Sequence, residues 1–279
     1  MGKLSQQDVD NWLLSASQPF HYKDVLNGQV SPDLFPQLRV YVGRSKYCEK
    51  MDGRSDGWFR PKDMELEELE WWVTEGKGVD IKLPMGLHKY CEFYLPCVIL
   101  VSGLYNQGKT AFLMNIVNLN MDNFDIRLFL SEGGELLKKR MDKLNSFIPK
   151  PPPFKSYHRR DNFQDIIFPH AFNIIDYLRV DADNLMASWN DIGAIANKLG
   201  KDGVAVIAMQ KPPGRKLAYG GPGTAFEPQL YMWIDKGRCG FEKIKVPKPS
   251  DVDPYSLVFN FTIKNGVNFE DLHTTTTDY

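Results

Sequence analysis

Hydrophobic positions at the start of the chain repeat with a helical period. In "QQDVDNWLLSA", Val9, Trp12 and Leu13 fall on one helical face, and Ser5 with Asp8 three residues later is typical of a helix N-terminus. A second short helix is predicted over "HYKDVLNG", closed by Gly28. Ser31-Pro32 predicts the start of a third helix, and Pro36 limits its regular portion to residues 37–47.

A β-ribbon is predicted after these helices. Asp52-Gly53 and Asp56-Gly57 are tight-turn dipeptides between "KM" and "WFR". Three short helices followed by a ribbon resemble the winged helix–turn–helix family. We therefore expect a small winged-helix domain over residues 1–62.

The end of this domain is locally basic. We expect DNA contacts from basic side chains of its third helix and ribbon, namely Arg39, Arg44, Lys46, Arg54 and Arg60. Such side chains hold phosphates while a helix lies in the major groove of duplex DNA. The alternative is a solvated face on a winged helix that binds another protein.

Residues 63–80 are predicted to form a connector. "DMELEELEWW" has a capping Asp63 and acidic residues near its start, which favour a helix. Met64, Leu66, Leu69 and the Trp72-Val73 pair give that helix an apolar side, and Gly76 and Gly78 end it. The apolar side is expected to pack on its own chain or on a neighbouring subunit.

Strands alternate with helices in the third region, residues 81–279. Apolar, β-branched runs predict strands and amphipathic runs predict helices in the order strand 97–102, helix 109–119, strand 126–131, helix 134–146, strand 172–177, helix 186–199 and strand 203–209. This rhythm predicts an α/β domain with a mainly parallel sheet flanked by helices. "PKPPPF" (149–154) is predicted to be an extended surface loop.

The last part of the chain favours further strands. "LYMWI", "FEKIKV" and "SLVFNFTIKNGVNFE" are strand-like, and Asn265-Gly266 predicts a hairpin turn. The tail "HTTTTDY" is expected to be frayed.

Composition limits the classes of partner and compartment. The net charge of −1 gives no global basic field, so any nucleic-acid site is a local patch. The four cysteines lack zinc-ligand spacing, and we expect reduced thiols in a cytoplasmic protein. The chain has no apolar run near the ~20 residues that cross a bilayer, so no membrane association is expected.

One segment carries a strong chemical signal. Gly103-x-x-x-x-Gly108-Lys109-Thr110 lies between a predicted strand and a predicted helix, which is the phosphate-binding P-loop. Backbone N–H groups and the helix N-terminus hold phosphates, Lys109 reaches the β- and γ-phosphates, and the Thr110 hydroxyl binds Mg²⁺. The sequence thus predicts ATP and Mg²⁺, with nucleotide contacts from Gly103, Asn106, Gln107, Gly108, Lys109, Thr110 and Ala111.

Two carboxylates complete the predicted site. Asp176 ends the apolar strand in "AFNIIDYLRV", where a P-loop protein holds its metal. Glu132, after the strand in "RLFLSEGGELLKKR", is expected to activate water near the γ-phosphate. Glu135 is the competing candidate, although it fits the first turn of the following helix.

The order of these motifs carries a family resemblance. The P-loop, "LSEGGELLKKR", "NIIDYL" and "GVAVIAMQK" resemble, over about residues 81–269, the RecA-like ATPases, nearest to the ring-shaped replicative helicases. The chain differs from ring helicases in having a winged helix in place of a helical collar, and in showing no clear arginine in the final finger position.

The resemblance implies further roles. Gln210 would sense the γ-phosphate, and the loop 211–226 would contact nucleic acid, with phosphate contacts from Lys211, Arg215 and Lys216. An ordinary surface loop is the alternative. The resemblance also implies a homo-oligomer, a ring or a filament, in which a basic residue of a neighbouring subunit completes the site; the candidates are Lys243, Lys245 and Lys248, with Arg238 as a further option.

Three functions follow. The first is a Mg²⁺-dependent ATPase acting on or with DNA, as a helicase-like motor or an accessory in replication or recombination; its core would bind single-stranded DNA, and its winged helix duplex. The second is an ATP-switched DNA-binding regulator or loader with slow turnover and no translocation. The third is an ATPase whose winged helix binds protein.

Overall fold

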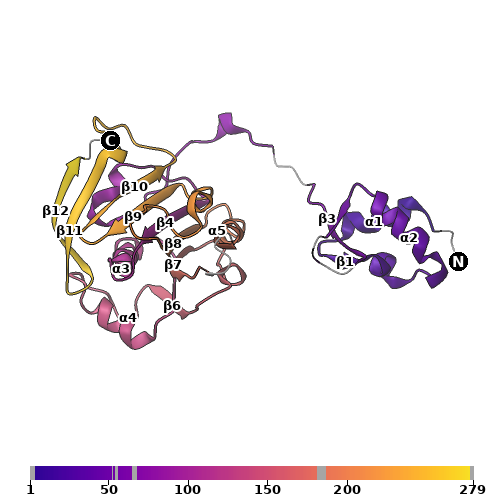
Figure 1. Cartoon of the computed structure of the whole chain (residues 1–279), viewed down its shortest axis with the longest axis horizontal. Helices are drawn as coiled ribbons and strands as arrows, with labels where there is room; N and C mark the ends of the chain where they lie inside the picture. The colour runs from indigo at the N-terminus through magenta and orange to yellow at the C-terminus, as the bar shows by residue number, and fades with distance from the viewer. Residues whose placement is uncertain (1–3, 52, 54–55, 65–67, 181–186, 277–279) are drawn as a thin grey trace. The chain divides into compact units, whose positions relative to one another are not determined.

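The computed structural model describes residues 4–51, 53, 56–64, 68–180 and 187–276. The chain divides into two compact units, Met1–Glu75 and Gly76–Tyr279 (Figure 1). The division falls inside the predicted connector, and each unit has its own hydrophobic core.

The N-terminal unit combines helices with a three-stranded antiparallel sheet of order β1-β3-β2. Val9 and Leu13 of the first helix pack with Leu38 and Val42 of the second in a small buried cluster. The elements are α1 (Gln6–Ser15), β1 (Phe20–His21), η1 (Tyr22–Gly28), η2 (Pro32–Leu34), α2 (Phe35–Arg44), β2 (Cys48–Lys50) and β3 (Trp58–Pro61).

Local chemistry explains where these elements agree with the prediction and where they do not. The Oγ of Ser5 accepts from the backbone N–H of Asp8 at 3.2 Å, as the capping signal predicted. Pro36 lies in the first turn of α2, where a missing N–H costs no hydrogen bond, so the predicted range 37–47 was wrong at both ends. The second predicted helix is the 3-10 helix η1 rather than an α-helix, and the backbone of Leu26 and Asn27 within it is left-handed. The strand β1 was not predicted from the sequence.

The predicted connector helix does not form in the residues described there. Only Trp71–Val73 is helical, as the 3-10 turn η3, and Leu66 lies outside the described residues. The side chains of Met64, Leu69, Trp71, Trp72 and Val73 are 57% to 75% exposed. The expectation that they pack on their own chain is therefore wrong for the described part of the connector.

The second unit is built on a nine-stranded mixed sheet of order β12-β11-β10-β9-β4-β8-β7-β5-β6. The six strands from β9 to β6 run parallel to one another, whereas β10, β11 and β12 each run antiparallel to their neighbours in the sheet. The strands are β4 (Cys97–Gly103), β5 (Ile126–Leu130), β6 (Phe154–His158), β7 (Phe172–Leu178), β8 (Val204–Gln210), β9 (Leu230–Asp235), β10 (Arg238–Ile244), β11 (Leu257–Lys264) and β12 (Asn268–Thr276).

Helices cover both faces of the parallel part of this sheet. They are α3 (Lys109–Asn120), α4 (Gly134–Met141) and α5 (Ala187–Ala196), with short 3-10 turns η4 (Pro84–Lys89), η5 (Phe163–Asp165), η6 (Gly221–Ala225) and η7 (Pro254–Ser256). Ile99 and Val101 of β4 pack into one cluster, while Val98 and Leu100 pack into another. Because β4 is buried on both faces, its sequence is continuously apolar, as parallel strands require.

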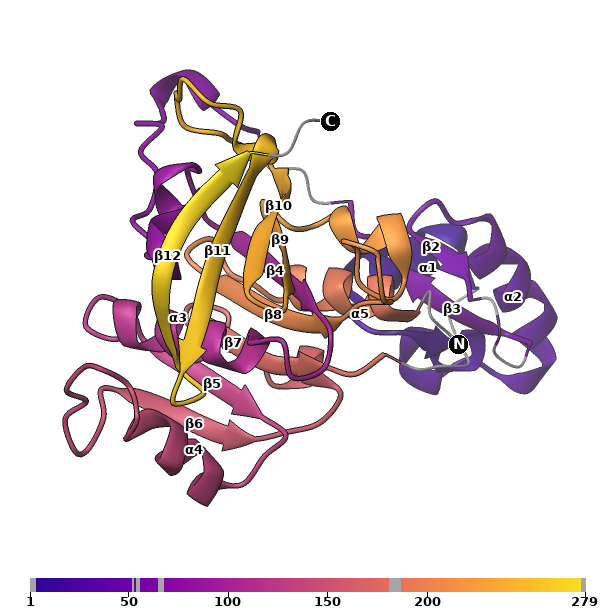
Figure 2. The same ribbon diagram turned by 60° about the vertical axis from the view of Figure 1, so that its left-hand side comes forward.

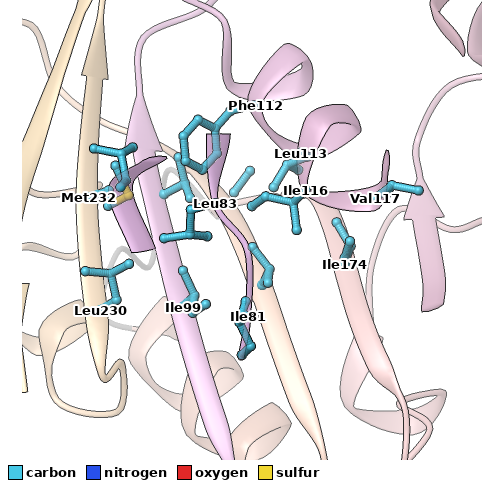
Figure 3. Packing of buried hydrophobic residues seen from close by; sticks show 14 of the residues in the cluster. Ile81, Leu83, Ile99, Phe112, Leu113, Ile116, Val117, Ile174, Leu230 and Met232 are labelled. Carbon is cyan, nitrogen blue, oxygen red and sulfur yellow. The ribbon is translucent and has the colours of Figure 1, made fainter. Parts of the chain in front are cut away.

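The larger cluster places α3 firmly against the sheet. Phe112, Leu113 and Ile116 of α3 lie over Ile99 and Met232 from neighbouring strands (Figure 3). This packing fixes the N-terminus of α3 at the carboxyl end of β4, which positions the site described below.

The C-terminal hairpin passes beside α3 (Figure 2). The amide of Asn115 in α3 donates to the carbonyl oxygen of Val267 in the hairpin turn at 2.7 Å. Thr274 to Thr276 pair with β11, so the expectation of fraying was wrong up to Thr276; residues 277–279 lie outside the described part.

The remaining predicted elements are mostly confirmed. The strands at 97–102, 126–131, 172–177 and 203–209 and the helix at 109–119 are present within a residue or two, and the hairpin turns at Asn265-Gly266. Two differences stand out: α4 ends at Met141 rather than residue 146, and the unforeseen edge strand β6 begins at Phe154 directly after the prolines. Of the helices in the described residues, none has the length and apolar character needed to cross a membrane.

Candidate functional site

The predicted phosphate loop, residues 103–110, joins β4 to α3 and depends on its two glycines. Gly108 has φ +104°, and a Cβ there would lie 2.5 Å from Cδ1 of Ile263. A Cβ on Gly103 would lie 2.9 Å from the backbone oxygen of Ile234. Because larger residues would close this space, the loop keeps a concave backbone at the N-terminus of α3, suited to an anion.

Lys109 points back into this loop. Its Nζ donates to the carbonyl oxygens of Gly103 and Leu104, each at 2.8 Å. Burial lowers the pKa of Lys109 to about 8, against the opposing effect of Asp176, while nearby Lys211 lowers it further. A buried ammonium held by neutral carbonyl oxygens is well placed to exchange them for a charged phosphate.

Thr110 and Asp176 meet across the ends of α3 and β7. The Thr110 hydroxyl donates to the Asp176 carboxylate, which is only 7% exposed. Burial raises the pKa of Asp176, the Thr110 hydrogen bond opposes that effect, and the charge of Glu132 adds to it. A hydroxyl and a carboxylate oxygen side by side are ligands that Mg²⁺ prefers, so these residues fit the predicted metal.

Glu132 follows β5 and is held by Arg140 of α4. The guanidinium makes two contacts, Nη1 with Oε2 and Nη2 with Oε1, the second at 3.1 Å. Glu132 lines the same cavity as Lys109 and Asp176, whereas Glu135 lies in the first turn of α4 away from it. The geometry thus favours Glu132 over its competitor.

These groups surround one cavity of about 640 Å³. Gln210, the last residue of β8, also lines it. Gln107 lines it too, and its Oε1 is buried without a hydrogen-bond partner in the described residues.

Sequence reasoning missed several residues that line the cavity, among them Arg140, Ile263 and Gly266. Arg140 lies eight residues after Glu132, but Glu132 precedes α4, so no helical spacing connected the two residues in the sequence. Ile263 and Gly266 reach the cavity from the β11–β12 hairpin. No local spacing could have connected them with the loop at 103–110.

The loop after Gln210 is anchored on its inner side. Lys211 is buried: its Nζ lies 2.8 Å from Oδ1 of Asp235 and donates to the carbonyl oxygen of Arg215 at 2.5 Å. The expectation that Lys211 contacts nucleic acid does not fit this position. Arg215 and Lys216 are exposed, as such contacts require.

The candidates for a residue acting on a neighbouring subunit differ in their surroundings. Lys243 donates to the carbonyl oxygen of Ala225 at 2.7 Å, and Lys248 to that of His88 at 3.2 Å. Lys245 and Arg238 are exposed, although Nη2 of Arg238 lies 3.9 Å from Oδ2 of Asp235, so Lys245 is the better placed of the four.

Acidic neighbours reduce the predicted basic patch of the N-terminal unit. Arg39 and Lys50 both pair with Asp56, whose pKa these contacts lower, and Arg60 pairs with Glu49. Two further candidates, Arg44 and Lys46, are exposed, while Arg54 lies outside the described residues.

Comparison with known proteins identifies no family for this chain. No protein-family model matches the chain, and no curated protein sequence matches it.

Proposed function

We propose that the protein is a Mg²⁺-dependent ATPase with a RecA-like core. The observation that supports this most is the convergence of Lys109, Thr110, Glu132 and Asp176 on one cavity. They come from the ends of three strands, and each has the chemistry that phosphoryl transfer requires.

Each of these residues has a separate role in the proposed hydrolysis of ATP. The backbone around Gly108 and the ammonium of Lys109 bind the β- and γ-phosphates, while Thr110 and Asp176 hold the metal. Bound Mg²⁺ would supply positive charge to the phosphate oxygens. The Glu132 carboxylate orients and deprotonates the attacking water, and Gln210 at the end of β8 senses the γ-phosphate.

The leading form of this proposal is an ATPase that acts on or with DNA, as a helicase-like motor or an accessory in replication or recombination. The N-terminal unit has the element order of a winged helix, with α2 as the helix offered to duplex DNA. Arg215 and Lys216 in the exposed part of the loop at 211–226 offer contacts to a single strand.

An ATP-switched DNA-binding regulator or loader is the second candidate. The exposed side chains of Arg44 and Lys46 favour it, because contacts with duplex phosphates need no translocation. In this form turnover would be slow. If the Arg39–Asp56 pair belongs to a protein-binding surface, the N-terminal unit would bind a protein partner instead of DNA.

The proposal includes a cytoplasmic homo-oligomer, a ring or a filament. Exposed Trp71 and Trp72 in the connector support it, since large apolar side chains in water favour association. Lys245 and Arg238 are exposed and available to a neighbouring site.

Hydrolysis measured with and without DNA tests the proposal. We expect Mg²⁺-dependent release of phosphate from ATP, stimulated by single-stranded DNA and reduced to a small residual rate in Lys109→Ala and Glu132→Gln. Duplex binding that depends on ATP while turnover stays slow would favour the switch. Absence of hydrolysis and of nucleotide binding would reject the proposal in every form.

A further inference from the structure

Arg140 is a charged residue of α4 that turns toward the cavity, while Leu137 and Met141 of the same helix pack against the core. None of the residues of α4 is fully buried, yet Arg140 reaches back across the helix to the carboxylate of Glu132 at the end of β5. The side chains of Arg140 and Glu132 are 25% and 37% exposed, so the pair sits partly out of water at the wall of the cavity.

The two contacts fix both oxygens of one carboxylate. A guanidinium that engages a carboxylate through two nitrogens restricts its rotation as well as its location. Glu132 otherwise has rotatable bonds and lies beside a second carboxylate, Asp176, whose pKa it raises. Without a cation at this place, repulsion between the two carboxylates would favour turning Glu132 out of the cavity.

The cavity holds two cations, Lys109 and Arg140, and two carboxylates, Asp176 and Glu132. The charges of Lys109, Arg140 and Glu132 all act on the pKa of Asp176. The two cations serve different partners: Lys109 is directed at the phosphate loop, and Arg140 at Glu132.

We propose that Arg140 is a positioning residue for Glu132, and that it acts on hydrolysis through that carboxylate and not through the nucleotide. The inference rests on the proposed function, since it assigns a support to the proposed base. A base displaced by about 1 Å loses roughly 10²-fold in rate, so the effect of Arg140 should be of that order.

A double-mutant cycle tests the inference. Arg140→Gln, Glu132→Gln and the double variant are compared for kcat, KM and the Kd of a Mg²⁺-bound, non-hydrolysable ATP analogue. We expect Arg140→Gln to lower kcat by roughly 10²-fold with nucleotide affinity unchanged. In the Glu132→Gln background, removal of Arg140 should cost nothing more, because the group through which it acts is already gone.

Matched variants separate positioning from structure. Lys139→Gln removes the same charge from an exposed neighbouring position of α4 and should leave all three constants unchanged. Arg140→Lys keeps a charge but offers only a single ammonium, and it should recover part of the lost kcat. It also keeps the experiment informative if Arg140→Gln does not fold.

Two results would overturn the inference. In the first, the decreases in kcat caused by Arg140→Gln and Glu132→Gln multiply in the double variant, or Arg140→Gln weakens nucleotide affinity as much as it lowers kcat. Either outcome would mean that Arg140 acts on the phosphates. In the second, Lys139→Gln lowers kcat as much as Arg140→Gln does. The effect would then come from the net charge of α4 and not from the contact with Glu132. Failure of the proposed function is distinguishable, because the wild type would then bind no nucleotide at all.

Discussion

Lys109 and Gly103, the two ends of the phosphate loop, are joined by a hydrogen bond: the lysine Nζ lies 2.8 Å from the glycine carbonyl oxygen. This contact holds a cation in a buried place against a neutral acceptor, and burial is the main reason why the pKa of Lys109 falls to about 8. The loop thus contains a group that titrates near neutral pH.

Nucleotide affinity should therefore depend on pH. Phosphate binds the protonated lysine better, so affinity is highest below the pKa of about 8 and decreases as pH rises through it. Between pH 7 and pH 9 the Kd should weaken about tenfold, measured by titration with a fluorescent ADP and Mg²⁺. Lys109→Met should bind more weakly but show a flat profile across this range; a flat profile in the wild type would contradict the assignment.

Gly108→Ala should damage both binding and stability. The new Cβ would lie 2.5 Å from Ile263 on a backbone with φ +104°, at a cost of about 2 kcal/mol or more. We expect the melting temperature of the second unit to fall by roughly 4–8 °C and nucleotide binding to be abolished. Gly133→Ala is the control, because a Cβ added at Gly133 would have no atom within 4 Å. Equal losses of stability and nucleotide binding in both variants would refute the steric argument.

Duplex DNA binding should depend on the exposed basic residues of the N-terminal unit. Arg44→Glu with Lys46→Glu should weaken affinity about tenfold or more and lower the salt slope by about 1 for each phosphate that the protein no longer neutralises. Lys198→Glu with Lys201→Glu makes the same charge change on the second unit and should have a smaller effect. If the two double variants behave alike, α2 and the residues after it do not bind the DNA.

Association should depend on the connector. Trp71→Ala with Trp72→Ala removes two exposed side chains of the kind that anchor interfaces, each worth about 2 kcal/mol or more when buried. We expect the concentration for assembly with Mg²⁺ and nucleotide to rise at least about tenfold by analytical ultracentrifugation. Leu14→Ala with Val252→Ala removes exposed apolar side chains elsewhere and should leave assembly unchanged. Unaltered assembly in the tryptophan variant would exclude the connector.

Local signals in the sequence predicted the strand, loop and helix that carry the centre of the candidate site. The strand–loop–helix at 97–119 combines an apolar run, two glycines and an amphipathic pattern, so each level indicates the same structure. Asp176 lies near the end of β7 and Glu132 just after β5, and both were found from the apolar strands, because parallel strands bring their carboxyl ends together.

Long-range contacts account for what was missed. Lys211 was predicted at the surface because its loop is polar, but Asp235 from another strand end draws it inside. Ile263 enters the cavity through a hairpin far along the chain. The connector has a helical pattern but little described helix, since an isolated short helix gains little without a surface to pack on.

Uptake of a non-hydrolysable ATP analogue tests the central claim most directly. Isothermal titration should show one analogue bound per chain with Mg²⁺ present, much weaker binding when Mg²⁺ is chelated, and disappearance of this metal dependence in Asp176→Asn. A wild-type protein that takes up no nucleotide with Mg²⁺, or an Asp176→Asn variant that keeps the full metal dependence, would contradict the account.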